Sequence, residues 1–207
     1  MRLHSLSITA IGPFPGTHEI DFASLSAGGL FLLEGPTGAG KSTIIDAVVF
    51  ALYGELASSA SSRDRLTSRH AAAGTTPAVE LVFETGAGIY RVRRSPEHLR
   101  PKQRGSGLTK EHARVQLWRL ADPADPAGQP VSTRVGEADS EISRVVGLSR
   151  EQFVQTVVLP QGEFATFLRA TPEERRAVLQ RLFGTEVYQR MQDRLAEAAR
   201  SARQRAD

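Results

Sequence analysis

The stretch Gly-Pro-Thr-Gly-Ala-Gly-Lys-Ser-Thr at residues 35–43 constrains this chain more than any other part of its sequence. A glycine, four residues, then glycine, lysine and a hydroxyl residue is the pattern of a phosphate-binding loop. Its glycines can take up conformations that bulkier residues resist, so backbone N–H groups can point inward at a phosphate. The residues predicted to bind a nucleotide are Gly35, Pro36, Thr37, Gly38, Ala39, Gly40, Lys41, Ser42 and Thr43.

The residues on either side of this loop support the interpretation. Residues 30–35 form a continuous apolar run, which predicts a strand buried on both faces of a sheet. After the loop, apolar residues recur at helical spacing from Ser42 to Tyr53, and Gly54 follows where a helix would end. A strand, a glycine-rich loop and a helix in this order are the context that the motif requires.

Two side chains of the loop carry the predicted chemistry. Lys41 would place its charge on the β- and γ-phosphates of ATP, and we predict it as the catalytic residue. The Ser42 hydroxyl would bind Mg²⁺. The predicted cofactors are therefore ATP and Mg²⁺.

The acidic partner of such a loop is missing from the sequence. Hydrolysis needs a hydrophobic strand that ends in an Asp-Glu pair, and none of the runs LFLLE, VELVFE and VQLWRL ends in this way. Residues 25–29 (LSAGG) resemble the signature of ABC-type ATPases, but they lead into the apolar run instead of opening a helix, so we predict a turn. The chain is expected to bind nucleotide and, alone, to hydrolyse almost none.

A second landmark lies far along the chain, at VVLPQGEF (157–164). Gln161 lies between proline and glycine, 120 residues after Lys41, which is the place of a glutamine loop that contacts the metal ion or its water. Without the phosphate loop, a polar turn residue would be the preferred interpretation.

The rest of the chain contains segments with the spacing of strands and segments with the spacing of helices. Predicted strands lie around residues 6–8 and at 18–22, 78–84, 88–94 and 113–120, and predicted helices lie at 137–146, from 171 and from 185 onward. The polar segment 95–112 is predicted to be flexible, and residues 157–164 to start as a short extended piece. The 3-4-3-4 spacing of Tyr188, Met191, Leu195, Ala198 and Ala202 predicts the start of a coiled coil, although two heptads also fit an amphipathic surface helix.

Positive charge is concentrated in residues 91–119. This block holds nine Lys and Arg against two Glu, a net +7, whereas the whole chain is only +3. Few aromatic side chains accompany the charges, which favours contact with duplex DNA phosphates over base stacking. The predicted DNA contacts are Arg93, Arg94, Arg100, Lys102 and Arg104, and the alternative is a solvated basic hairpin without a partner.

Composition excludes several classes of protein. The sequence has no cysteine, so disulfides and thiolate metal sites are excluded. It has no apolar run of the ~18 residues needed to span a membrane. We expect a cytoplasmic protein without membrane contact.

Three stretches together resemble the N-terminal head segment of the SbcC family of ATPases: residues 35–55, 90–109 and 157–188. The resemblance implies an α/β P-loop NTPase of the ABC/SMC head type. Its mixed sheet would contain antiparallel strands, with an N-terminal lobe at 1–184 and the start of a coiled coil at 185–207. It also implies four partners: a C-terminal lobe of the same protein, a second head, a nuclease subunit of the SbcD type and duplex DNA. Such a complex would be nucleoid-associated.

Two other functions remain open. An SMC-like ATPase that organises chromosomes without a nuclease has the same head, and only a docking site for the nuclease would separate the two. A kinase for a small substrate also uses a phosphate loop, but Gln161 and the heptad segment do not fit it.

Overall fold

The computed structural model describes residues 1–57, 66–102, 106–158, 171–172 and 186–206. The chain divides into two compact units, Met1–Arg150 and Glu151–Asp207, and each is described by itself. The predicted boundary between lobe and coiled coil, at residues 184 and 185, lies outside the described residues and stays a prediction.

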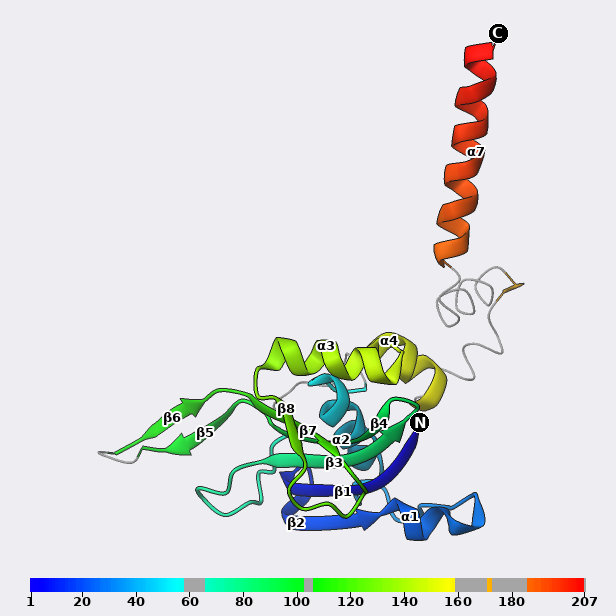
Figure 1. Ribbon diagram of the computed structural model, residues 1–207. Helices are drawn as coiled ribbons and strands as arrows, with labels where there is room; N and C mark the ends of the chain where they lie inside the picture. The colour runs from blue at the N-terminus through cyan, green and yellow to red at the C-terminus, as the bar shows by residue number, and fades with distance from the viewer. Residues whose placement is uncertain (58–65, 103–105, 159–170, 173–185, 207) are drawn as a thin grey trace. The chain divides into compact units, whose positions relative to one another are not determined.

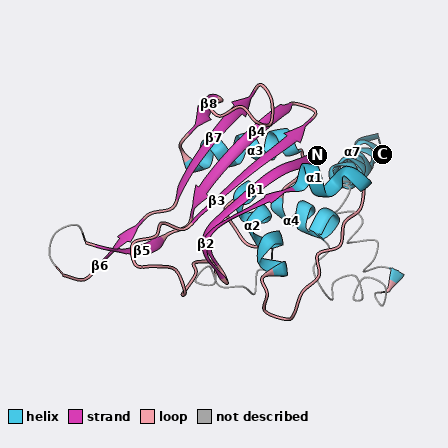
Figure 2. Cartoon of the chain, turned by 90° about the horizontal axis from the view of Figure 1, so that it is seen from below, coloured by secondary structure: helices cyan, strands magenta, loops and turns pink. Residues whose placement is uncertain are grey.

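The first unit is built on a six-stranded sheet with the order β2-β1-β3-β4-β7-β8 (Figures 1 and 2). Its strands are β1 (Arg2–Ile11), β2 (Phe14–Asp21), β3 (Ala78–Thr85), β4 (Gly88–Ser95), β7 (Arg114–Leu120) and β8 (Gln129–Ser132). The α/β class is confirmed, and every pair of strands in the described residues is antiparallel. The sequence missed β8, a short strand with Pro130 that lies at the edge, where proline removes no ladder hydrogen bond.

One face of this sheet forms the core. Leu6, Leu81, Val92 and Leu117 lie opposite one another on four neighbouring strands, and all four are buried. Helices α2 (Lys41–Tyr53) and α3 (Val135–Val146) pack on the sheet and end at Gly54 and Gly147, as predicted. The inward-facing residues of the strands and the apolar faces of the two helices therefore pack into one core.

The basic segment 95–112 is more ordered than predicted. It contains a hairpin of β5 (His98–Pro101) and β6 (Leu108–Glu111), which pair antiparallel as a separate two-stranded sheet. Arg100 donates to Glu111 on the opposite strand at 2.5 Å. Such cross-strand pairs stabilise a hairpin. The two strands were not predicted because their sequences are polar and show no clear alternation of apolar residues.

The strand predicted at residues 30–35 is absent. The segment has no regular secondary structure, and the side chains of Leu30 and Leu32 are 89% and 86% exposed. A strand buried on both faces needs neighbouring strands and covering layers, and no described strand pairs with this segment. The prediction was wrong because an apolar run specifies burial only where a partner surface exists.

The segment before this run forms the predicted turn. Helix α1 (Phe22–Leu25) is one turn long and continues into the 3₁₀ turn η1 (Ser26–Gly28), which ends at Gly29 with φ +79°. The LSAGG stretch therefore ends α1 and forms a 3₁₀ turn, and it opens no α-helix.

The second unit is mostly helical in its described parts. Helix α4 (Arg150–Phe153) crosses into it and is followed by a π-helical turn, η3 (Val154–Val158). Val157 and Val158 lie in this turn, so the prediction of an extended segment was wrong for them. Helix α7 (Glu186–Ala206) confirms the predicted helix, and Met191 and Leu195 on its predicted seam are exposed. None of the described helices is long and apolar enough to cross a membrane.

Candidate functional site

The phosphate loop joins residue 34 to the start of α2. Gly38 and Gly40 have φ values of +86° and +97°, the left-handed region that favours glycine. Gly40 is the N-cap of α2, which begins at Lys41 as the motif predicted. Gly35 does not have a positive φ, so the conformational argument holds for two of the three glycines.

Lys41 folds back over its own loop. Its Nζ donates to the carbonyl oxygen of Gly35 at 2.6 Å and to that of Pro36 at 2.8 Å. An ammonium group has three donors, so one remains for a phosphate oxygen at the mouth of the loop. The charge of Lys41 is thereby held over the loop before a nucleotide arrives.

The loop fits a nucleotide and Mg²⁺ in its exposure and chemistry. Residues 35–39 and Ser42 are exposed, and the amino end of α2 lies directly behind them. Free N–H groups and the helix dipole at that end favour a phosphate, and the Ser42 hydroxyl in the first turn is an oxygen ligand of the kind Mg²⁺ prefers. Bound Mg²⁺ would neutralise charge on the phosphates.

Gln161 lies outside the described residues, so its predicted metal contact stays a prediction. Within the described part of the chain, no cluster of histidine and acidic side chains could hold a metal ion.

The other end of α2 is held by Arg94, which was predicted to contact DNA. The residue is only 3% exposed, and its side chain donates to the carbonyl oxygens of Ala51 at 2.7 Å and Leu52 at 3.1 Å. It also forms an ion pair with Asp139 on α3. A cation at a helix C-terminus is favourable. Arg94 is therefore a core residue that joins β4, α2 and α3, and its assignment to DNA was wrong.

Two of the remaining basic candidates, Arg93 and Arg100, are paired with carboxylates. Arg93 donates to Glu80 at 3.3 Å, and Arg100 to Glu111 at 2.5 Å. The hydrogen bond from Arg100 lowers the pKa of Glu111, and the charge of Arg114 adds to this. Lys102 is exposed, and Arg104 lies outside the described residues. Part of the positive charge of residues 91–119 is thus already paired with carboxylates.

Asp46 is a half-buried polar residue to which no sequence motif assigns a role. It lies on α2, and its carboxylate accepts from the backbone N–H of Ala57 at 3.2 Å. Partial burial raises the pKa of Asp46, and this hydrogen bond opposes the rise. Asp46 ties the chain that follows Gly54 back to the helix.

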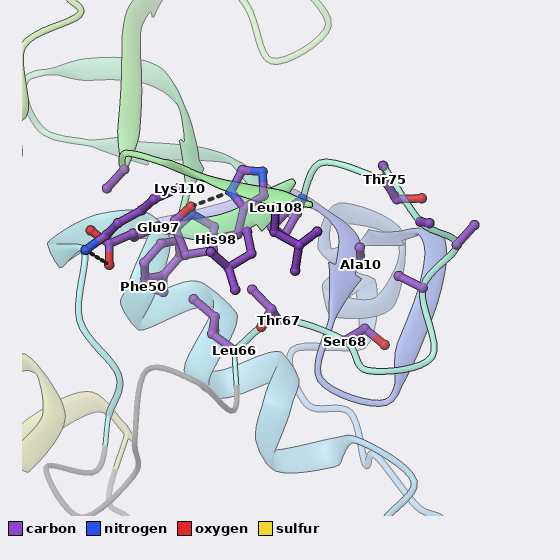
Figure 3. A pocket seen from close by; sticks show the side chains of 18 of the residues that line it. Ala10, Phe50, Leu66, Thr67, Ser68, Thr75, Glu97, His98, Leu108 and Lys110 are labelled. Carbon is purple, nitrogen blue, oxygen red and sulfur yellow. Dashed lines mark hydrogen bonds and ion pairs between the residues drawn. The ribbon is translucent and has the colours of Figure 1, made fainter. Parts of the chain in front are cut away.

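A cavity of about 720 Å³ lies between α2, the segment after residue 65 and the β5–β6 hairpin. Figure 3 shows Phe50, Leu66, His98 and Leu108 around it, with Ala10 of β1 at one side. Leu108 is exposed although it is apolar. Nothing in the sequence predicted this cavity, because the three segments are distant along the chain.

Comparison with known proteins identifies the family. The profile of the AAA domain family matches residues 5–206. The chain belongs to the AAA domain family. The predicted P-loop ATPase class is therefore confirmed over almost the whole length of the chain.

Among curated proteins, the chain is similar to SbcC subunits of SbcCD nucleases. The chain is 36% identical over 203 residues to the SbcC subunit of the SbcCD nuclease of Vibrio cholerae, covering 98% of this chain and 20% of that protein. It is 37% identical over 196 residues to the same subunit of Deinococcus radiodurans, covering 93% and 19%. The resemblance to SbcC is confirmed, and the chain spans about a fifth of the length of these curated relatives.

Among solved structures, the chain is similar to the SMC head domain from Thermotoga maritima. The TM-score is 0.38 at 24% sequence identity, covering 68% of this chain and 42% of that one.

Proposed function

We propose that this chain is the ATP-binding lobe of the ATPase subunit of an SbcCD-like nuclease complex. ATP bound at residues 35–43 would bring two heads together, and this dimerisation would control the access of duplex DNA to a nuclease subunit in repair or recombination. The similarity to the SbcC subunits of SbcCD nucleases supports this function. Such a complex would act in the cytoplasm, on the nucleoid.

The observation that carries the proposal is the exposed apolar run directly before the phosphate loop. Residues 30–33 are Leu-Phe-Leu-Leu, and all four side chains are exposed large hydrophobics. An exposed apolar segment of this kind marks a surface that another part covers. A C-terminal lobe of the same protein would add strands there and supply the missing Asp-Glu pair.

Hydrolysis tests this divided site. We expect residues 1–207 alone to bind ATP weakly and to hydrolyse almost none, because the group that activates water is missing. Addition of the C-terminal lobe should give Mg²⁺-dependent turnover in a phosphate-release assay. Substantial turnover by the pure 207-residue chain that is lost in Lys41→Ala would contradict the proposal.

Contact with DNA is now proposed for the four other basic candidates, Arg93, Arg100, Lys102 and Arg104. Surface ion pairs such as those of Arg93 and Arg100 are weak, so both cations can exchange a carboxylate for a DNA phosphate. Phosphate contacts carry no sequence information and weaken steeply with salt.

Charge reversal tests the hairpin. We expect Arg100→Glu with Lys102→Glu and Arg104→Glu to weaken binding of duplex DNA at low salt and to flatten its salt dependence. Fluorescence anisotropy with the two-lobed protein measures both quantities. Reversal of Arg134, an exposed arginine that pairs with Glu137 on α3, is the control. Unchanged duplex binding in the triple variant would rule out this surface.

An ATPase that organises chromosomes without a nuclease remains the second candidate, because it would use the same lobe. Co-purification with a nuclease subunit separates the two functions, and the segment from residue 185 onward is the proposed docking site. Phosphoryl transfer to a small molecule by this chain alone would instead indicate a kinase.

A further inference from the structure

The turn between β1 and β2 packs directly on the phosphate loop. A Cβ atom built on Gly40 would lie 2.6 Å from Cζ of Phe14 and 2.9 Å from Cγ of Pro13. A Cβ atom built on Gly12 would lie 2.7 Å from Cγ2 of Thr43. The turn and the loop therefore touch at two points, each of which only a glycine permits.

Gly40 is a sensitive place for such a contact. It has a φ of +97° and is the residue at which the loop becomes helix α2. Its orientation decides where the N–H groups at the start of the helix point. The half-buried ring of Phe14 covers this residue and leaves it little room to move.

The turn is braced on its other side. Gly12 donates its N–H to the carbonyl oxygen of Leu66 at 2.8 Å, and Ser68 donates to that of Ala10 at 2.9 Å. A bulge interrupts β1 between Thr9 and Ile11. Ala10 within it has a φ of +53°, the one positive φ of a non-glycine residue in the described chain. An alanine keeps this conformation only where its surroundings fix it, as they do here.

We propose that Phe14 is a positioning residue of the nucleotide site. Its ring, held by the braced turn, fixes Gly40 and so presets the phosphate-binding geometry of the loop. This inference rests on the proposed function, because it requires that residues 35–43 bind a nucleotide. The part of the ligand whose binding depends on Phe14 is the polyphosphate chain, which ATP and inorganic tripolyphosphate share.

Two ligands distinguish positioning of the phosphate loop by Phe14 from stacking of Phe14 on the adenine base. In the full-length protein, Phe14→Ala should weaken the binding of both Mg-ATP and inorganic tripolyphosphate by about tenfold, since preorganisation of the loop is lost. Phe14→Leu keeps apolar bulk over Gly40 and should restore most of the affinity for both. Isothermal titration calorimetry measures the affinities, and chemical denaturation confirms that each variant is folded.

The outcomes are distinct. Loss of ATP binding with unchanged tripolyphosphate binding would overturn the proposal in favour of base stacking, and equal affinities in wild type and Phe14→Ala would overturn it outright. If the wild-type protein bound neither probe, the proposed nucleotide site itself would fail.

A second pair of variants keeps the test open where Phe14→Ala does not fold. Gly12→Ala directs a methyl group at Thr43 and should weaken binding, and adding Thr43→Ser removes the opposing methyl group and should recover part of it. No recovery in a folded double variant would count against the contact.

Discussion

Replacing Lys41 with alanine is expected to lower the affinity of the full-length protein for Mg-ATP by about 100-fold, since a charge-assisted hydrogen bond contributes about 1.5–3 kcal/mol. The lysine Nζ lies over the loop, held by the carbonyl oxygens of Gly35 and Pro36. Its removal takes away the single side-chain charge of the loop and leaves backbone N–H groups and uncharged hydroxyls. Calorimetric titration with Mg-ATP gives the affinity directly.

Lys110→Ala is the matched control for this experiment. Lys110 is an exposed lysine on β6 that pairs with Glu97 at 2.8 Å, outside the phosphate loop. We expect its removal to leave the affinity unchanged. Equal effects of the two substitutions would mean that Lys41 acts through general charge and not through the loop.

Replacing Arg94 with methionine is expected to lower the free energy of unfolding by about 3 kcal/mol, the lower end for a broken buried ion pair. The substitution keeps apolar volume but leaves two helix carbonyls without their donor and Asp139 without its partner. Asp139 is partly exposed, which limits the loss. Urea denaturation followed by circular dichroism measures the change.

Arg93 is the neighbouring control on the same strand. Its side chain is 53% exposed and pairs with Glu80 at the surface, where an ion pair contributes less than about 1 kcal/mol. Arg93→Met should therefore be close to wild type. A loss for Arg94→Met no greater than for Arg93→Met would refute the core role assigned to Arg94.

This pair of arginines shows where sequence reasoning succeeds and fails. Alternating burial along β4 is visible in the sequence, and it places Val92 and Arg94 on one face and Arg93 on the other. Charge counting treated both arginines as surface residues, because a buried arginine is rare and its partners come from α2 and α3. Which cations are buried depends on contacts that local patterns do not contain.

The phosphate loop was the most predictable part of the site. Residue type, spacing and the helical periodicity that follows placed the loop and the start of α2. The contact of Phe14 with Gly40 could not be predicted, since the sequence of residues 12–16 indicates a turn but not its neighbour. The strand predicted from the apolar run at 30–33 was wrong for another reason: the run is hydrophobic, but no described strand pairs with it.

The anchoring of α2 at both ends has a mechanical consequence. The helix is 13 residues long, which corresponds to about 20 Å. Arg94 links the carboxyl end of α2 to β4 and α3 through a hydrogen bond and an ion pair. Phe14 contacts Gly40 at the amino end of the helix. Helix α2 can therefore hardly move along its axis. Any movement at its amino end, beside the phosphate loop, becomes a small rotation about its carboxyl end. Ligand occupancy would then reach α3 as a change of angle, through Arg94 and through the direct packing of α2 on α3.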